Sequence, residues 1–192
     1  MSLHHNPTHG HGLARLVTWA VWVLLNVAGV LGGYFLALGI SKVAVSAGPS
    51  IPDRGITALT IPLIGLLLGL GQWLVVRRHL RRPAWWVAAT FVGWIVPIGL
   101  AIPVPMLDPL PARVQLLAIL AAIGLGTGIA QALVLRGPAR RVALWVAASL
   151  AGWLLLAATL PVPITGLGGL VWVGAAPALV TGAAWVLGVD DP

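Results

Sequence analysis

The amino-acid sequence predicts an all-α integral membrane protein with six transmembrane helices. The first reason is composition: of 192 residues, 59% are hydrophobic and only 8% are charged. A soluble domain carries roughly 25% charged residues, so most of this surface must face lipid rather than water. The other two reasons are a set of long apolar segments and an internal repeat of helical hairpins.

The apolar segments set the predicted membrane spans. The hydrocarbon core of a bilayer is about 30 Å thick, so a spanning helix needs about 20 apolar residues. Six segments meet this length, contain no charged side chain and are separated by Pro, Arg or Asp: residues 16–40, 57–76, 84–102, 114–135, 142–160 and 167–187. The first segment is much longer than the roughly 7–15 apolar residues of a signal peptide, so we expect the protein to retain it.

The N-terminal tail is distinct from the membrane domain. Residues 1–14 hold four histidines among Gly, Pro and Asn, which predicts a flexible tail, and residues 15–192 form the transmembrane domain. Histidine-rich tracts can bind metal, but the residues between these histidines favour a tail without a specific metal site.

The basic residues predict the orientation in the membrane. Of the 11 Lys and Arg residues, eight fall on one side of the six-span topology and three on the other. Loops rich in Lys and Arg stay in the cytoplasm, so both termini are expected on the cytoplasmic side of a bacterial plasma membrane. The arginines of the two basic turns are expected to contact lipid headgroups, not nucleic acid: Arg77, Arg78, Arg81, Arg82, Arg136, Arg140 and Arg141.

Tryptophans support these span boundaries. Trp85 and Trp86 follow one arginine group, and Trp145 follows the other. Amphipathic rings are favoured at this headgroup level, so these three are expected to act as anchors. Trp94 and Trp153 lie eight residues deeper, so we expect them to pack inside the bundle.

The chain repeats itself at a shift of 59 residues. The pattern G-x-x-x-G-x-x-Q-x-L-V-x-R, then A-x-W-V-x-x-x-x-x-G-W, occurs in repeats at about residues 61–103 and 120–162. Apolar composition alone would not align Gln, Arg and Trp, so the pattern indicates a duplicated helical hairpin. A third, weaker copy is split between the chain ends: segment 167–187 matches the second repeat at a shift of 54, and segment 16–40 matches the first at a shift of 64.

Hairpins that share one orientation should be related by an axis along the membrane normal, which predicts a bundle with approximate threefold pseudosymmetry. The repeat also places polar side chains at matching depths: Asn26, Thr90 and Ser149 in the second helix of each hairpin, and Gln72 and Gln131 in the first, where the split copy has Trp185. Unpaired amides are costly in lipid, so these groups should face one another and form hydrogen bonds. Two interpretations stay open: interhelical hydrogen bonding alone, or a small polar site that binds a headgroup, a polar group of a cofactor or a small solute.

The amino-acid composition argues against catalysis and metal binding. The sequence has no Cys and no Glu, and its four acidic residues lie in predicted loops or the C-terminal tail. No His lies in a predicted span and no catalytic or metal-binding motif is present, so we expect no catalytic residue, metal site or cofactor. Bound lipid is expected, and a pigment held through Gln or Asn, or between subunits, stays open.

Two segments carry a resemblance to known proteins. Residues 71–78, with the sequence GQWLVVRR, and residues 86–94, which begin WVAA and end GW, resemble a type of uncharacterised small multi-pass bacterial membrane protein. The resemblance covers most of the chain from Trp19 onward. It implies a bacterial plasma membrane protein and brings no activity or catalytic residues with it.

Two functions are compatible with these features. The first is a structural or accessory subunit of a larger membrane complex, of respiratory or photosynthetic type, which would pack against other membrane subunits. The alternative is a small-solute carrier, or the substrate-binding membrane component of a transporter, for which size is the only argument. A membrane enzyme is disfavoured because the spans offer no general base and no metal cluster.

Overall fold

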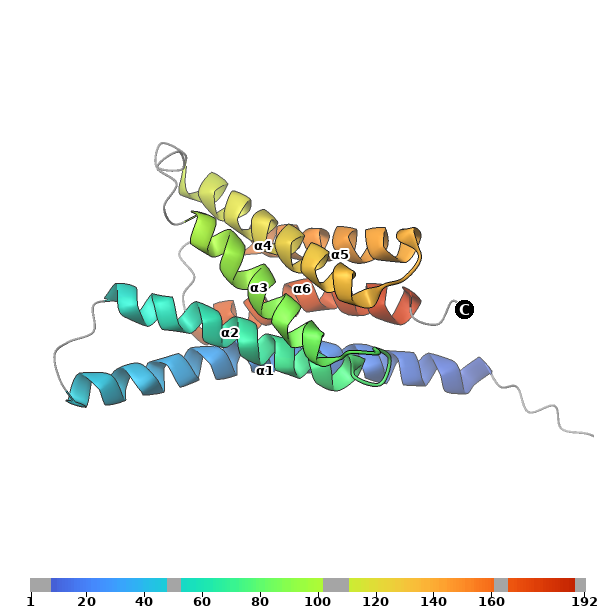
Figure 1. The fold of residues 1–192 in the computed structure, drawn as a ribbon, viewed down its shortest axis with the longest axis horizontal. Coiled ribbons are helices and arrows are strands. Elements are labelled where there is room, and N and C mark those ends of the chain that lie inside the picture. The colour runs from blue at the N-terminus through green and yellow to red at the C-terminus, as the bar shows by residue number, and fades with distance from the viewer. Residues whose placement is uncertain (1–7, 48–52, 102–110, 161–165, 189–192) are drawn as a thin grey trace, which may run out of the picture.

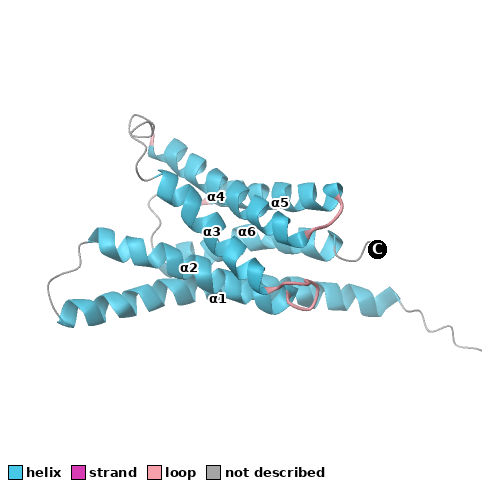
Figure 2. Ribbon diagram, in the orientation of Figure 1, coloured by secondary structure: helices cyan, strands magenta, loops and turns pink. Residues whose placement is uncertain are grey.

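The computed structural model describes residues 8–47, 53–101, 111–160 and 166–188, and these residues form helices and turns (Figures 1 and 2). The helices are α1 (Thr8–Ala47), α2 (Asp53–Val76), α3 (Ala84–Ala101), α4 (Ala112–Leu135), α5 (Ala139–Thr159) and α6 (Gly166–Gly188). Each predicted apolar segment corresponds to one helix, so the all-helical prediction is confirmed for the described residues. In lipid, a single segment can satisfy its own backbone N–H and C=O groups only as a helix.

Helix α1 is longer than its predicted span. It has 40 residues, and it extends past the other helices at the end where the chain begins (Figure 1). Residues 8–14, assigned to a flexible tail from the sequence, form its first turns here, and residues 1–7 lie outside the described residues. A nucleated helix extends at little cost through good helix formers such as Leu13, Ala14 and Arg15.

Four helices are long and apolar enough to cross a membrane: α1, α4, α5 and α6. In α2 and α3, the apolar stretches found among the described residues are shorter, at Thr60–Val76 and Ala84–Gly99. The length and composition of the helices therefore indicate a multi-pass membrane protein.

The helices form a closed ring in chain order. Each helix packs against the next one, and α6 packs against α1. The start of α1, the end of α6, the α2–α3 turn and the α4–α5 turn lie at the same end of the bundle (Figure 1). We call this the arginine end, because these segments carry Arg15, Arg77, Arg78, Arg81, Arg82, Arg136, Arg140 and Arg141.

Glycines bring neighbouring helices of the ring into close contact. Gly29, Gly93 and Gly152 occupy matched positions of the repeat, and each lies against the backbone of the next helix. A Cβ atom added at Gly93 would lie 2.5 Å from the Cα atom of Thr127. These contacts join α1 to α2, α3 to α4 and α5 to α6. Small residues permit such backbone approach, and the resulting dispersion contacts help to hold membrane helices together.

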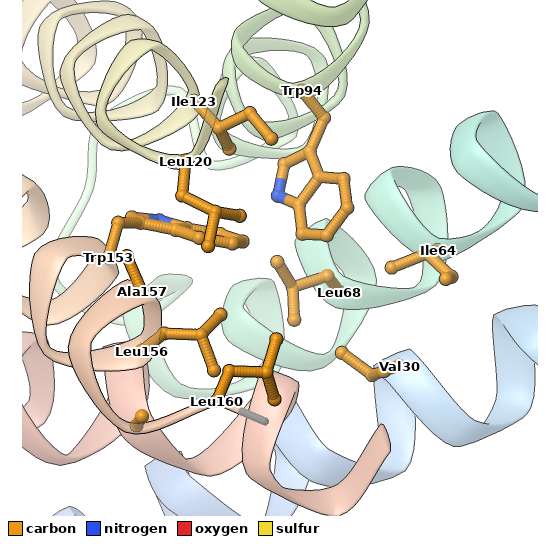
Figure 3. Packing of buried hydrophobic residues seen from close by; sticks show 11 residues of the cluster. Val30, Ile64, Leu68, Trp94, Leu120, Ile123, Trp153, Leu156, Ala157 and Leu160 are labelled. Carbon is orange, nitrogen blue, oxygen red and sulfur yellow. The ribbon is translucent and has the colours of Figure 1, made fainter. Parts of the chain in front are cut away.

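A buried cluster fills the ring away from the arginine end. It contains Trp94 and Trp153, whose ring centroids lie 5.1 Å apart at an interplanar angle of 73° (Figure 3). Their burial confirms the prediction that these two tryptophans pack inside the bundle. The other buried members of the cluster are aliphatic: Val30, Ile64, Leu68, Leu120, Ile123, Leu156, Ala157, Leu160 and Ala176.

The tryptophans nearer the arginine end correct one expectation. Trp86 and Trp145, expected as headgroup anchors, are only 0% and 4% exposed and belong to a second buried cluster. Trp85, by contrast, is 60% exposed. Consecutive residues of a helix point about 100° apart, so when Trp86 faces the core its neighbour turns outward. Of the three, Trp85 has the exposure that suits an anchor.

Candidate functional site

Four tryptophans form a compact cluster on the axis of the ring, nearer its arginine end. Trp22, Trp86 and Trp145 occupy matched positions of α1, α3 and α5, and Trp185 comes from α6. All six pairs of ring centroids lie between 5.5 and 6.4 Å apart. Five of the six pairs are edge-to-face, a geometry that adds about 0.5–1.5 kcal/mol per pair beyond surface burial. We call this set the tryptophan cluster.

Three indole N–H groups of the cluster donate to polar side chains. Trp86 Nε1 donates to Gln72 Oε1 at 3.0 Å, and Trp145 Nε1 donates to Gln131 Oε1 at 3.2 Å. Each of these bonds joins a pair of residues 14 positions apart in the chain. In the third unit Trp185 stands where the others have glutamine, and Trp22 Nε1 donates instead to Thr181 Oγ1 at 3.2 Å.

Three amide side chains continue from these bonds as a directed chain. Gln131 Nε2 donates to Gln72 Oε1 at 2.9 Å, and Gln72 Nε2 donates to Asn26 Oδ1 at 2.8 Å. Asn26 Nδ2 then donates to the backbone oxygen of Trp22 at 2.8 Å. Because every amide donates in the same direction, each bond polarises the next and strengthens it. This amide chain crosses the bundle from α4 through α2 to α1.

The two hydroxyl groups of the predicted polar set differ in their role. Thr90 Oγ1 accepts a hydrogen bond from Gln131 Nε2 at 2.8 Å and lies 2.9 Å from the backbone oxygen of Trp86, to which it donates. Ser149 stands apart, because its hydroxyl donates to the backbone oxygen of Gly124 at 2.9 Å. The structure thus brings four of the five predicted residues into one network and places the fifth beside it.

The network encloses little space. A cavity of about 20 Å³, which we call the axial cavity, is lined by polar and aromatic residues that include Asn26, Gln72, Gln131, Ser149 and Trp145. Pockets for small molecules usually measure about 300–1,000 Å³, so this cavity has no room for a metabolite. The amides are neutral and bonded to one another, so their chemistry is that of interhelical hydrogen bonding.

A larger pocket opens at the arginine end, next to the tryptophan cluster. It has a volume of about 190 Å³, and its lining includes His79, Arg141, Trp145, Trp185 and Gly188. The ring of His79 meets Trp185 edge-on at 5.7 Å. A cation beside aromatic faces suits a small anion that also carries an apolar or flat part. We call this the arginine-end pocket. The feature of the sequence that could have indicated it is Trp185, which occupies the position that is glutamine in the other two repeat units.

Arg141 differs from the other arginines that were expected at lipid headgroups. Its side chain turns inward, where Nε and Nη2 both donate to the backbone oxygen of Gly188 at the end of α6. The last carbonyl groups of a helix lack internal donors, so a guanidinium group satisfies them well. The remaining arginines of the set are exposed to the surroundings: Arg77, Arg78, Arg81, Arg82, Arg136 and Arg140.

The amide chain predicts a measurable loss on substitution. Gln131→Leu keeps a similar volume but removes both hydrogen bonds donated by Gln131 and the acceptor of Trp145. We expect the free energy of unfolding to fall by about 1–3 kcal/mol, because the Trp145 N–H is left buried without a partner. Equilibrium unfolding in mixed detergent micelles measures this change.

A double-mutant cycle provides the control for that result. Gln72→Leu combined with Gln131→Leu should cost less than the sum of the single changes, since both residues belong to one network. Strictly additive losses would contradict a network shared by the two glutamines.

The fold and its interior together define a class: a multi-pass helical membrane protein whose axis is closed by tryptophan and amide side chains. Comparisons with protein-family models, curated proteins and solved structures found no match to this chain.

Proposed function

We propose that the protein is a non-catalytic structural or accessory subunit of a larger membrane complex, of respiratory or photosynthetic type, in the bacterial plasma membrane. The filled axis is the observation that carries this proposal. Within the part of the chain that the structure describes, the axial cavity measures only about 20 Å³, and Trp145 lines both this cavity and the arginine-end pocket. A bundle whose axis offers no path for a solute is better suited to supporting other subunits of a complex than to transport.

The ring supports six spans with both termini in the cytoplasm. Helices α2 and α3 pack between α1 and α4, so they should lie at the same membrane depth as helices that are long enough to cross. The start of α1 and the end of α6 lie at the arginine end (Figure 1). Basic loops favour the cytoplasmic side, which would place both ends of the bundle there.

Equivalent contacts support the duplication and its approximate threefold arrangement. Trp22, Trp86 and Trp145 meet at one point of the axis with mutual centroid distances of 6.4, 6.0 and 5.5 Å. The bond from Trp86 to Gln72 has its counterpart in the bond from Trp145 to Gln131. Parallel repeats related by an axis along the membrane normal would produce such equivalences.

The surface of α1 supports packing against another subunit. Near its start, at the arginine end, Leu13, Leu16 and Val17 are 69%, 64% and 53% exposed. A helix of 40 residues exceeds the roughly 20 residues that span a bilayer, so part of its apolar surface should extend beyond the hydrocarbon core. Exposed apolar surface in that position is typical of a protein–protein contact.

A second candidate function is the binding of a small anionic solute, as a carrier or as the substrate-binding membrane component of a transporter. The arginine-end pocket favours it, because Arg141 and two tryptophans line a volume of about 190 Å³. Such a pocket could hold a small anion at one end of the bundle, and the anion would not need to pass along the axis.

One experiment separates the two proposals. The protein is extracted from its native membranes with a mild detergent, and mass spectrometry of the intact fraction identifies bound proteins and small molecules. An absorption spectrum of the same fraction reports any pigment. Partner subunits that copurify reproducibly would support the accessory role. If α1 carries the contact, the double variant Leu13→Glu plus Leu16→Glu should no longer copurify with these partners. A solitary protein with a bound anion that is lost on Arg141→Gln would support solute binding instead.

A further inference from the structure

Among the residues that the structure describes, two buried side-chain atoms in the middle of the bundle have no hydrogen-bond partner. They are Trp94 Nε1 and Thr127 Oγ1, and both atoms are shielded from the surroundings. The two residues are only 5% and 4% exposed. Buried polar groups in folded proteins are nearly always bonded to protein or to ordered water, so each of these atoms calls for a partner.

Both residues line the axial cavity. Its volume of about 20 Å³ exceeds the roughly 10–15 Å³ that a single water molecule requires on this measure. Figure 3 shows the indole nitrogen of Trp94 on the ring edge that faces Trp153 and Leu120, toward the middle of the buried cluster. The unpaired groups and the available space therefore coincide.

Helix α6 lines the same cavity at a proline, where we expect a free backbone acceptor. Pro177 lies inside α6 and has no backbone N–H, so the carbonyl of Val173, four residues earlier, lacks its usual helical donor. Val173 and Pro177 both line the cavity. The lining thus offers an indole donor and a hydroxyl group, and the carbonyl of Val173 is the expected backbone acceptor. A buried water molecule typically makes about three hydrogen bonds, which matches this set.

We propose that one water molecule is bound in the axial cavity. This water accepts a hydrogen bond from Trp94 Nε1, forms a second hydrogen bond with Thr127 Oγ1 and donates a third to the backbone oxygen of Val173. The water ties α6 to α3 and α4 across the axis of the ring.

The first test detects the water directly. The protein is labelled with ¹⁵N-tryptophan and placed in lipid nanodiscs, and magnetisation transfer from water to each indole N–H is measured by NMR. Loss of one signal in Trp94→Phe assigns Trp94. A cross-peak with water at Trp94 is expected, whereas Trp86, which donates to Gln72, serves as the control without one. A missing cross-peak at Trp94 would overturn the proposal.

The second test depends on the sign of a stability change. Thr127→Val keeps the shape of the side chain and removes the hydroxyl group. If water is bound, the variant should lose a partner, lower the Tm by about 2–4 °C and weaken the Trp94 cross-peak. In a dry cavity the same change removes an unpaired polar group and should raise the Tm. Thr18→Val, at an exposed hydroxyl that bonds its own helix, should leave the Tm unchanged. A raised Tm in Thr127→Val would indicate a dry cavity and overturn the proposal.

Discussion

Replacing Trp86 with alanine should lower the free energy of unfolding by about 3–5 kcal/mol. Trp86 is fully buried at 0% exposure, and its ring meets the three other members of the tryptophan cluster. The change leaves a cavity on the axis and removes the indole N–H that donates a hydrogen bond to Gln72 Oε1. Unfolding by increasing denaturing detergent, followed by tryptophan fluorescence and circular dichroism, measures the loss.

The neighbouring residue provides a matched control. Trp85 differs from Trp86 by one position and is 60% exposed, so Trp85→Ala should change the free energy of unfolding by about 0.5 kcal/mol or less. Trp86→Phe retains an aromatic ring but loses the N–H, and its cost should lie between the two. Equal losses for the two alanine variants would contradict the assignment of Trp86 to the core.

Gly93→Ala should destabilise the bundle by about 1–3 kcal/mol through overpacking. The added Cβ atom would lie 2.5 Å from Thr127 Cα and 2.8 Å from Thr127 N. Backbone atoms cannot rotate away as a side chain can, so α3 and α4 must move apart. The movement should also stretch the bond from Gln131 to Thr90, which joins the same two helices. Equilibrium unfolding in mixed micelles measures the effect.

Gly99 is the control on the same helix. A Cβ atom there would meet nothing within 4 Å, so Gly99→Ala should be neutral or stabilising by up to about 1 kcal/mol, because alanine favours the helix. If Gly93→Ala were as well tolerated as Gly99→Ala, the close contact between α3 and α4 would be refuted.

The sequence predicted the helices closely because helix formation in lipid is a local property. Apolar length fixes where a span can lie, and Pro83 or the arginines of the turns mark where one ends. The repeat pattern also identifies Asn26, Gln72 and Gln131 as polar positions inside the spans, and all three are buried in the structure. A polar side chain inside an apolar segment must find a partner, so its identity alone is informative.

The faces of the helices could not be predicted in the same way. In a soluble protein, polar and apolar faces reveal which side of a helix is buried, but in a membrane the lipid and the core are equally apolar. Nothing local to residues 85 and 86 states that Trp86 turns inward while Trp85 turns outward. The same holds for Arg141, which caps the end of α6 instead of facing outward like Arg140.

The sequence by itself therefore determined the all-helical, multi-pass class, the helix positions and the polar residues that require partners. The tertiary structure alone decided which groups meet. It joined Trp185 to the tryptophan cluster, placed Ser149 outside the amide chain and left Trp94 Nε1 and Thr127 Oγ1 without a protein partner beside one cavity. The physical reason is that hydrophobicity specifies the depth and length of a membrane helix, whereas its rotation about its own axis depends on close packing against the other helices.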